Sequence, residues 1–196
     1  MNWLAHLLLS EPDPAFRLGN ILPDLVPLAR LGEVPAAVRR GIECHLRIDA
    51  FTDAHPVFRR SVQRFPAPYR RFGGVITDVF YDHFIARAWA DYSALPLPEF
   101  AAEFYASFDE HRTMVPAEAW EKMEGIRTRN LLCGYGTVAG VRDTLTRISA
   151  RLRRPFDLGA AATELETQGA AFQEDFAEFF PQLWAHAGPS RPPRSA

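Results

Sequence analysis

The chain has 196 residues, of which 47% are hydrophobic and 23% are charged, and its formal net charge is −2. This composition is typical of one soluble globular domain, and it argues against a general basic nucleic-acid-binding protein. Two cysteines far apart in sequence, Cys44 and Cys133, do not make a disulfide framework, which favours a reducing, cytoplasmic setting. We expect no signal peptide and no membrane span, because the apolar start of the chain is short and lacks a basic region.

The first predicted element is a short apolar helix over residues 2–10, interrupted by His6. A single histidine on an apolar face is more often a hydrogen-bonded core residue than a ligand. Pro12 and Pro14 then break the chain. Asp24 follows a proline, and the simplest role for it is to cap the start of a helix.

A long helix is predicted from Pro35 to Asp53, because Pro35 suits a first turn and His55-Pro56 ends the helix. At 100° per residue, Asp49 lies about 40° from His45, on the face that is expected to point at the core. Buried ionised groups cost several kcal/mol unless they are paired or bind metal. Two explanations remain open: a hydrogen-bonded helix end, or a metal site.

Residues 72–92 form the most strongly predicted helix of the middle region, with apolar side chains all round it, which is typical of a buried helix. Asp78 and Asp82 lie four residues apart on it, and His83 is adjacent. The two carboxylates could share a proton, but a shared divalent cation is the simpler account. Together with His45 and Asp49, these residues offer the mixed nitrogen and oxygen ligands that suit Mn, Fe, Mg or Zn.

The rest of the chain is also predicted to be helical, over residues 97–111, 137–152 and 157–186, with a glycine-rich turn at 131–136. No alternating apolar run is long enough to predict a strand. The sequence therefore predicts a single all-α domain over residues 1–187, a helical bundle. Residues 188–196, rich in proline and serine, are predicted to be a flexible tail.

Charge is unevenly distributed. Residues 39–71 contain eight arginines and three acidic residues, a local net charge of +5, whereas residues 99–125 have a local net charge of −5 from seven acidic and two basic residues. Such asymmetry usually means only differently solvated surfaces. If it is functional, the basic segment attracts an acidic partner. The candidate partner-binding residues are Arg59, Arg60, Arg64, Arg70 and Arg71, with Arg39 and Arg40 as a second row.

Several motifs in the first half of the chain resemble the acyl carrier protein phosphodiesterase family, a divergent relative of the HD-domain phosphohydrolases. They are Met1-Asn-Trp-Leu-Ala-His6, Gly19-Asn20-x-x-x-Asp24, His45-x-Arg47-Ile-Asp49 and Asp78-x-x-x-Asp82-His83. The resemblance covers roughly residues 1–89 strongly. One departure is the order Asp82-His83, since HD proteins carry histidine before aspartate.

The resemblance implies an all-helical, HD-like fold and a divalent metal, typically Mn²⁺, with Mg²⁺ or Fe²⁺ as alternatives. It implies hydrolysis of the phosphodiester that joins 4′-phosphopantetheine to a serine of holo acyl carrier protein, an acidic protein that the basic segment would bind. The candidate metal ligands are Asp24, His45, Asp49, Asp78, Asp82, His83 and His6, and the candidate catalytic residues are Asp82, His83, His55 and Arg47. Two other functions stay open: a phosphohydrolase acting on a nucleotide or another small phosphoester, and a non-catalytic helical module that binds acidic carrier proteins.

Overall fold

The computed structural model describes residues 1–187, and every regular element within them is a helix, as the sequence predicts. In chain order the α-helices are α1 (Trp3–Leu8), α2 (Pro14–Leu25), α3 (Ala36–Ala54), α4 (Pro56–Arg64), α5 (Gly73–Arg87), α6 (Trp89–Tyr92), α7 (Leu97–Ala106), α8 (Ala117–Thr128), α9 (Leu131–Gly134), α10 (Val138–Ser149) and α11 (Thr163–Ala187). Short 3₁₀ helices lie at Leu28–Arg30, Tyr69–Phe72, Asp109–Met114 and Gly159–Ala162. The tail predicted at 188–196 lies outside the described residues.

The predicted helices overlap most of the observed ones, but α2 and α8 lie outside the predicted helix ranges, and the helices predicted over 97–111 and 157–186 are shorter as α-helices and include 3₁₀ segments. Three further differences concern the middle of the chain. The helix predicted over 72–92 ends at Arg87 and is followed by the separate short helix α6. The glycine-rich segment 131–136, predicted as a turn, contains the one-turn helix α9. The basic segment that begins at Pro56 contains α4, although only its charge pattern was noted in the sequence. The likeness to an HD fold stays a prediction.

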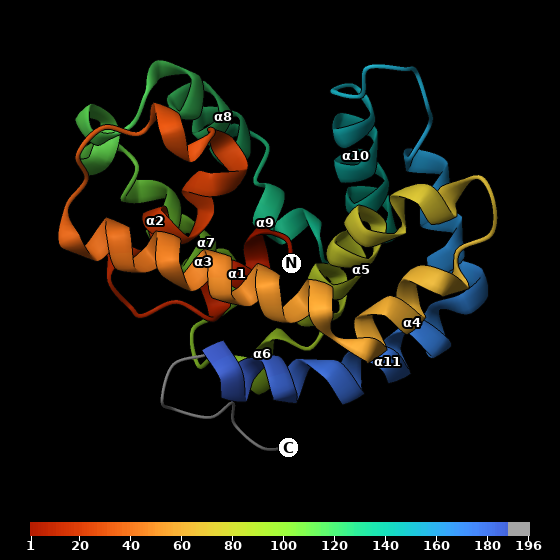
Figure 1. The fold of residues 1–196 in the computed structure, drawn as a ribbon. Coiled ribbons are helices and arrows are strands. Elements are labelled where there is room, and N and C mark those ends of the chain that lie inside the picture. Colours follow the sequence, from red (N-terminus) through yellow and green to blue (C-terminus); the bar gives the residue numbers. More distant parts are fainter. Residues whose placement is uncertain (188–196) are drawn as a thin grey trace.

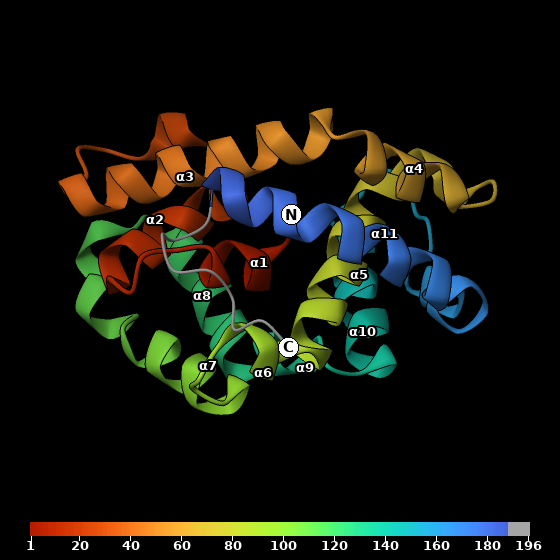
Figure 2. The same cartoon turned by 90° about the horizontal axis from the view of Figure 1, so that it is seen from below.

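Helix α1 lies at the centre of the molecule (Figures 1 and 2). It contacts α2 on one side and α5 on the other. The long helix α3 runs along one face, and α11 packs against α3, α4 and α5. Within residues 1–187, none of the helices combines the length and the hydropathy needed to cross a bilayer. The arrangement places the short α1 between α2, which carries Asp24, and α5, which carries Asp78 and Asp82.

Helices α2 and α3 cross with their backbones in near contact, at Gly19 and Gly41. A β-carbon added to Gly19 would lie 2.1 Å from the carbonyl oxygen of Val38, and one added to Gly41 would lie 2.1 Å from that of Phe16. Only glycine therefore fits at either position. The close crossing holds the carbonyl of Asn20, next to Gly19, within 2.8 Å of Nδ1 of His45 on α3.

Aromatic side chains fill the interface between α4, α5 and α11. The ring of Phe179 on α11 lies 5.5 Å from that of Tyr81 and 6.1 Å from that of Phe58, measured between centroids, and all three are buried. Aromatic pairs at such distances stabilise a core beyond the area that they bury. This interface fixes α5 in place, and α5 in turn contacts α1.

Candidate metal centre

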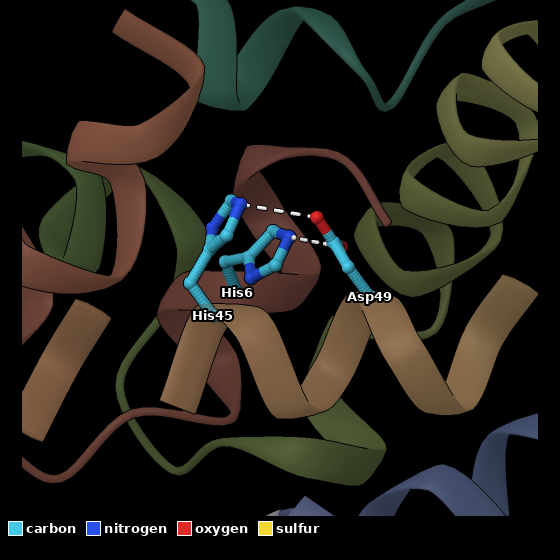
Figure 3. Close-up of side chains that lie close together, drawn as sticks. All are labelled: His6, His45 and Asp49. Atoms are coloured by element: carbon cyan, nitrogen blue, oxygen red, sulfur yellow. Dashed lines mark ion pairs between the residues drawn. The ribbon is translucent and has the colours of Figure 1, made fainter. Parts of the chain in front are cut away.

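Three side chains from two helices meet at the centre of the molecule: His6 of α1, and His45 and Asp49 of α3 (Figure 3). One possible ligand atom from each lies within 4.8 Å of the others. Nε2 of His45 is 3.0 Å from Oδ2 of Asp49, and Nε2 of His6 is 3.3 Å from Oδ1 of the same carboxylate. Both histidines are buried, and Asp49 is partly exposed. Because His45 and Asp49 are one helical turn apart, their spacing predicted that these two members of the group lie together.

Asn20 of α2, which is fully buried, orients both imidazole rings. Its side-chain NH₂ donates to the carbonyl of His6 at 2.8 Å and to the hydroxyl of Ser10 at 2.9 Å, which leaves Oδ1 to accept from Nδ1 of His6 at 3.1 Å. Nδ1 of His45 donates to the backbone carbonyl of Asn20 at 2.8 Å. Because both Nδ1 atoms are donors, both Nε2 atoms turn toward Asp49.

The group formed by His6, His45 and Asp49 brings hydrogen-bond acceptors close together, and the amino group of Met1 supplies a positive charge beside it, 3.2 Å from Oδ1 of Asp49. If both imidazoles are neutral, their Nε2 lone pairs face carboxylate oxygens, and acceptors repel one another. The two rings stack with centroids 4.2 Å apart and planes 14° apart, which disfavours a charge on both. Burial lowers the pKa of His6; burial also opposes protonation of His45, but Asp49 outweighs it and raises that pKa. Imidazole nitrogens and carboxylate oxygens that converge in this way are ligand types that divalent cations bind.

Two further carboxylates border the group. Oδ1 of Asp24, in the last turn of α2, is 3.9 Å from Nε2 of His45. The amino group of Met1 lies 3.2 Å from Oδ1 of Asp49 and 3.2 Å from Oδ1 of Asp78 on α5. Burial raises the pKa of Asp78 to about 6. For Asp49, the facing histidines and the amino group of Met1 outweigh burial and hold the pKa well below its usual range. Asp24 lies at the end of a helix, so the expectation that it caps the start of one was wrong.

Asp82, predicted as a ligand, is engaged by the backbone of α1. Its Oδ2 accepts from the amide of Leu4 at 2.7 Å, its Oδ1 accepts from the amide of Ala5 at 3.0 Å, and the residue is fully buried. Burial raises the pKa of Asp82 to about 8. The carboxylate satisfies two of the amides that every helix leaves free at its start, and so it anchors the helix that carries His6.

The other predicted catalytic residues are tied to other parts of the structure. Nδ1 of His83 is 2.7 Å from the carbonyl oxygen of Tyr135, and burial lowers the pKa of His83. His55 accepts from the amide of Val57 and so caps the start of α4. Arg47 is exposed on α3. The structure therefore does not bring His83, His55 or Arg47 into the group around Asp49.

The predicted partner-binding arginines divide into two sets. Arg60 and Arg64 form ion pairs with the buried Asp175 of α11 at 2.7 Å and 2.6 Å, and Arg60 also pairs with Glu178 at 2.6 Å. Their positive charge is thus largely neutralised within the chain. The remaining candidates are exposed: Arg39, Arg40, Arg59, Arg70 and Arg71.

Asp175→Ala is expected to lower the free energy of unfolding by roughly 2–3 kcal/mol. Removing one partner of a buried ion pair typically costs about 3–5 kcal/mol, and the cost is smaller here because Arg60 and Arg64 can turn toward solvent. The measurement is urea unfolding followed by circular dichroism. Glu178→Ala is the control, since Glu178 is exposed and its pair should contribute about 0.2–1 kcal/mol. Equal effects of the two substitutions would contradict a structural role for Asp175.

Asn20 had no predicted role, although the motif Gly19-Asn20-x-x-x-Asp24 contains it. The pattern that could have indicated its role is an amide residue next to a glycine, in a helix that is otherwise apolar at this point. His6 is predicted to be a satisfied core histidine or a candidate ligand. Asn20 satisfies its Nδ1, while its Nε2 faces Asp49, and its role as a ligand stays a prediction. A cavity of about 180 Å³ adjoins the group and is lined by Met1, Asp24 and Asp78, among others.

The chain is similar to known proteins over most of its length. Residues 1–183 match the family described as Acyl carrier protein phosphodiesterase. Proteins named acyl carrier protein phosphodiesterase from Photorhabdus laumondii subsp. laumondii, Serratia proteamaculans (strain 568) and Shigella boydii serotype 18 are 29%, 30% and 31% identical to it. The matches cover 95% of this chain in each case, and 95%, 97% and 97% of the relatives. No solved structure matches the chain.

Proposed function

Because the chain belongs to the acyl carrier protein phosphodiesterase family, we propose that it hydrolyses the phosphodiester between 4′-phosphopantetheine and a serine of holo acyl carrier protein. The products are apo acyl carrier protein and 4′-phosphopantetheine. The observation that supports this proposal best is the group His6, His45 and Asp49. Phosphoryl transfer needs positive charge near the phosphoryl oxygens, and this group favours a cation.

His6, His45 and Asp49 would hold a divalent cation, and Asp24 and Asp78 are further candidate ligands. Imidazole with carboxylate suits Mn²⁺ or Fe²⁺ better than Mg²⁺, which prefers oxygen ligands and retains its waters. We propose Mn²⁺, the ion that the family resemblance implies. When bound, the cation lowers the pKa of water and neutralises phosphoryl oxygens.

The residues of the chain itself supply orientation and charge. Asn20 holds both histidines with Nε2 turned toward Asp49, so no rearrangement of the rings is needed to bind a cation. Arg151 lines the adjoining cavity and is exposed, which suits a side chain that meets the phosphate of an incoming substrate. Exposed arginines within residues 39–71 are proposed to attract the acidic carrier protein.

The test is an electrophoretic assay that separates apo from holo acyl carrier protein by mobility. We expect conversion of holo to apo carrier protein with added Mn²⁺, loss of conversion after treatment with EDTA, and recovery when Mn²⁺ is restored. Full activity after complete removal of metal would contradict the cation site. Hydrolysis of nucleotides without conversion of the carrier protein would support a small-molecule phosphohydrolase, and binding of the carrier protein without conversion would support the non-catalytic module.

A further inference from the structure

A second cavity, of about 250 Å³, adjoins the one beside the candidate metal centre. Four residues line both cavities: Asn2, Trp3, Ile148 and Arg151. The second cavity lies among the N-terminal segment, α8, α9 and α10, and these three helices lie above the N-terminus in Figure 1. A molecule with its phosphate beside Asp24 and Asp78 would therefore have space to extend into the second cavity.

Tyr135, which lines the second cavity, is fully buried. Within residues 1–187, its hydroxyl has no hydrogen-bond partner. A buried hydroxyl without a partner is costly, so such a group in a native fold calls for an explanation. Burial raises the pKa of Tyr135 well above its ordinary value, which keeps the hydroxyl neutral and able to donate. The backbone of Tyr135 is held by the hydrogen bond between its carbonyl and His83.

The remaining walls combine apolar surface with further donors. Trp3, Ile126 and Ile148 supply apolar surface. The guanidinium of Arg147 donates to the hydroxyl of Thr144 at 2.8 Å. Lys122, Arg129 and Arg151 also line the cavity, with Glu121 as its one acidic residue. The cavity thus presents several donors beside apolar surface, which suits a chain that contains amide carbonyls.

We propose that this second cavity binds the pantetheine arm of the substrate, with the hydroxyl of Tyr135 donating to one of its amide carbonyls. The inference rests on the proposed function. Beyond its phosphate ester, the pantetheine arm is a flexible, uncharged chain with two methyl groups, two amides, one free hydroxyl and a terminal thiol, so it has both the apolar surface and the acceptors that these walls match. Binding of the arm distinguishes the holo from the apo carrier protein, because the apo form lacks it.

The test compares Tyr135→Phe with the unmodified protein in calorimetric titrations with pantetheine, 4′-phosphopantetheine and inorganic phosphate. Loss of one hydrogen bond should weaken binding of pantetheine and of 4′-phosphopantetheine about fivefold, and it should leave the affinity for phosphate unchanged. The thermal midpoint of Tyr135→Phe should not fall, because the hydroxyl has no partner in the free protein. Unchanged affinity for pantetheine, or no binding of pantetheine by the unmodified protein, would overturn the proposal.

Tyr105→Phe is the matched control. Tyr105 is also buried, but its hydroxyl accepts a hydrogen bond from the amide of Leu132 at 3.0 Å. Tyr105 does not line the cavity. This variant should lose stability and keep its affinity for pantetheine. A second variant, Ile148→Trp, should raise KM for the holo carrier protein by filling space that both cavities share. If the unmodified protein converts the holo carrier and both cavity variants retain its KM, the arm-binding proposal fails while the proposed function stands.

Discussion

Replacing Asp49 with alanine is expected to lower conversion of the holo carrier protein at least ~10³-fold. A cation supplies several kcal/mol of transition-state stabilisation, and about 4 kcal/mol corresponds to roughly 10³ in rate. Asp49 is the acid that both imidazoles face, so its loss removes the centre of the proposed site. The same variant should bind less Mn²⁺ in elemental analysis after dialysis, and its circular dichroism spectrum should remain helical.

Asp53→Ala is the control for Asp49→Ala, because Asp53 lies one turn further along the same helix and is exposed. This substitution should change activity less than about twofold, in line with the small effect of surface changes on stability. Activity of Asp49→Ala close to that of the unmodified protein would remove the group His6, His45 and Asp49 from the catalytic centre. It would leave the family membership untouched.

Gly41→Ala is expected to lower the free energy of unfolding by about 3 kcal/mol or more, the upper part of the range for overpacking. The added β-carbon would lie 2.1 Å from the carbonyl oxygen of Phe16 and 2.9 Å from the α-carbon of Gly19, and backbone atoms cannot turn aside as a flexible side chain can. Helices α2 and α3 must therefore separate. Because that movement also separates Asn20 from His45, activity should fall in the molecules that still fold.

Gly169→Ala makes the same substitution inside α11, where no atom lies within 4 Å of the added β-carbon. It should raise stability by about 0.5–1 kcal/mol, since alanine favours the helix over glycine. Urea unfolding of both variants gives the comparison. If Gly41→Ala lowers the free energy of unfolding by no more than about 1 kcal/mol, then α2 and α3 accommodate a β-carbon at their crossing.

The helices and the family could be predicted from the sequence, because both depend on local pattern. Apolar spacing, together with the prolines at positions 35 and 56, gave the extent of α3 to within one or two residues. The helical period placed His45 and Asp49 on one face, and the structure shows them 3.0 Å apart. The predictions of an all-α enzyme of the acyl carrier protein phosphodiesterase family are confirmed.

Contacts between distant segments could not be predicted in the same way. Asp78 and Asp82 share a helix, and their spacing suggests a common ligand. In the structure, however, Asp78 lies beside the amino group of Met1, and Asp82 accepts hydrogen bonds from the amides of α1. Arg60 and Arg64 look like free positive charges in the sequence, but α11 brings Asp175 to them from 115 and 111 residues away. Periodicity says which face of a helix is buried, and it does not say which partner the fold will bring there.

The anchoring of α1 by Asp82 has a consequence for how loss of structure would be detected. A helix of six residues does not persist by itself, so His6 reaches its neighbours only while α5 is docked behind it. If heat or denaturant slightly loosens the contact between α1 and α5, His6 would move away from His45 before the long helices unfold. Catalysis would then report early damage to this protein more sensitively than its helical content.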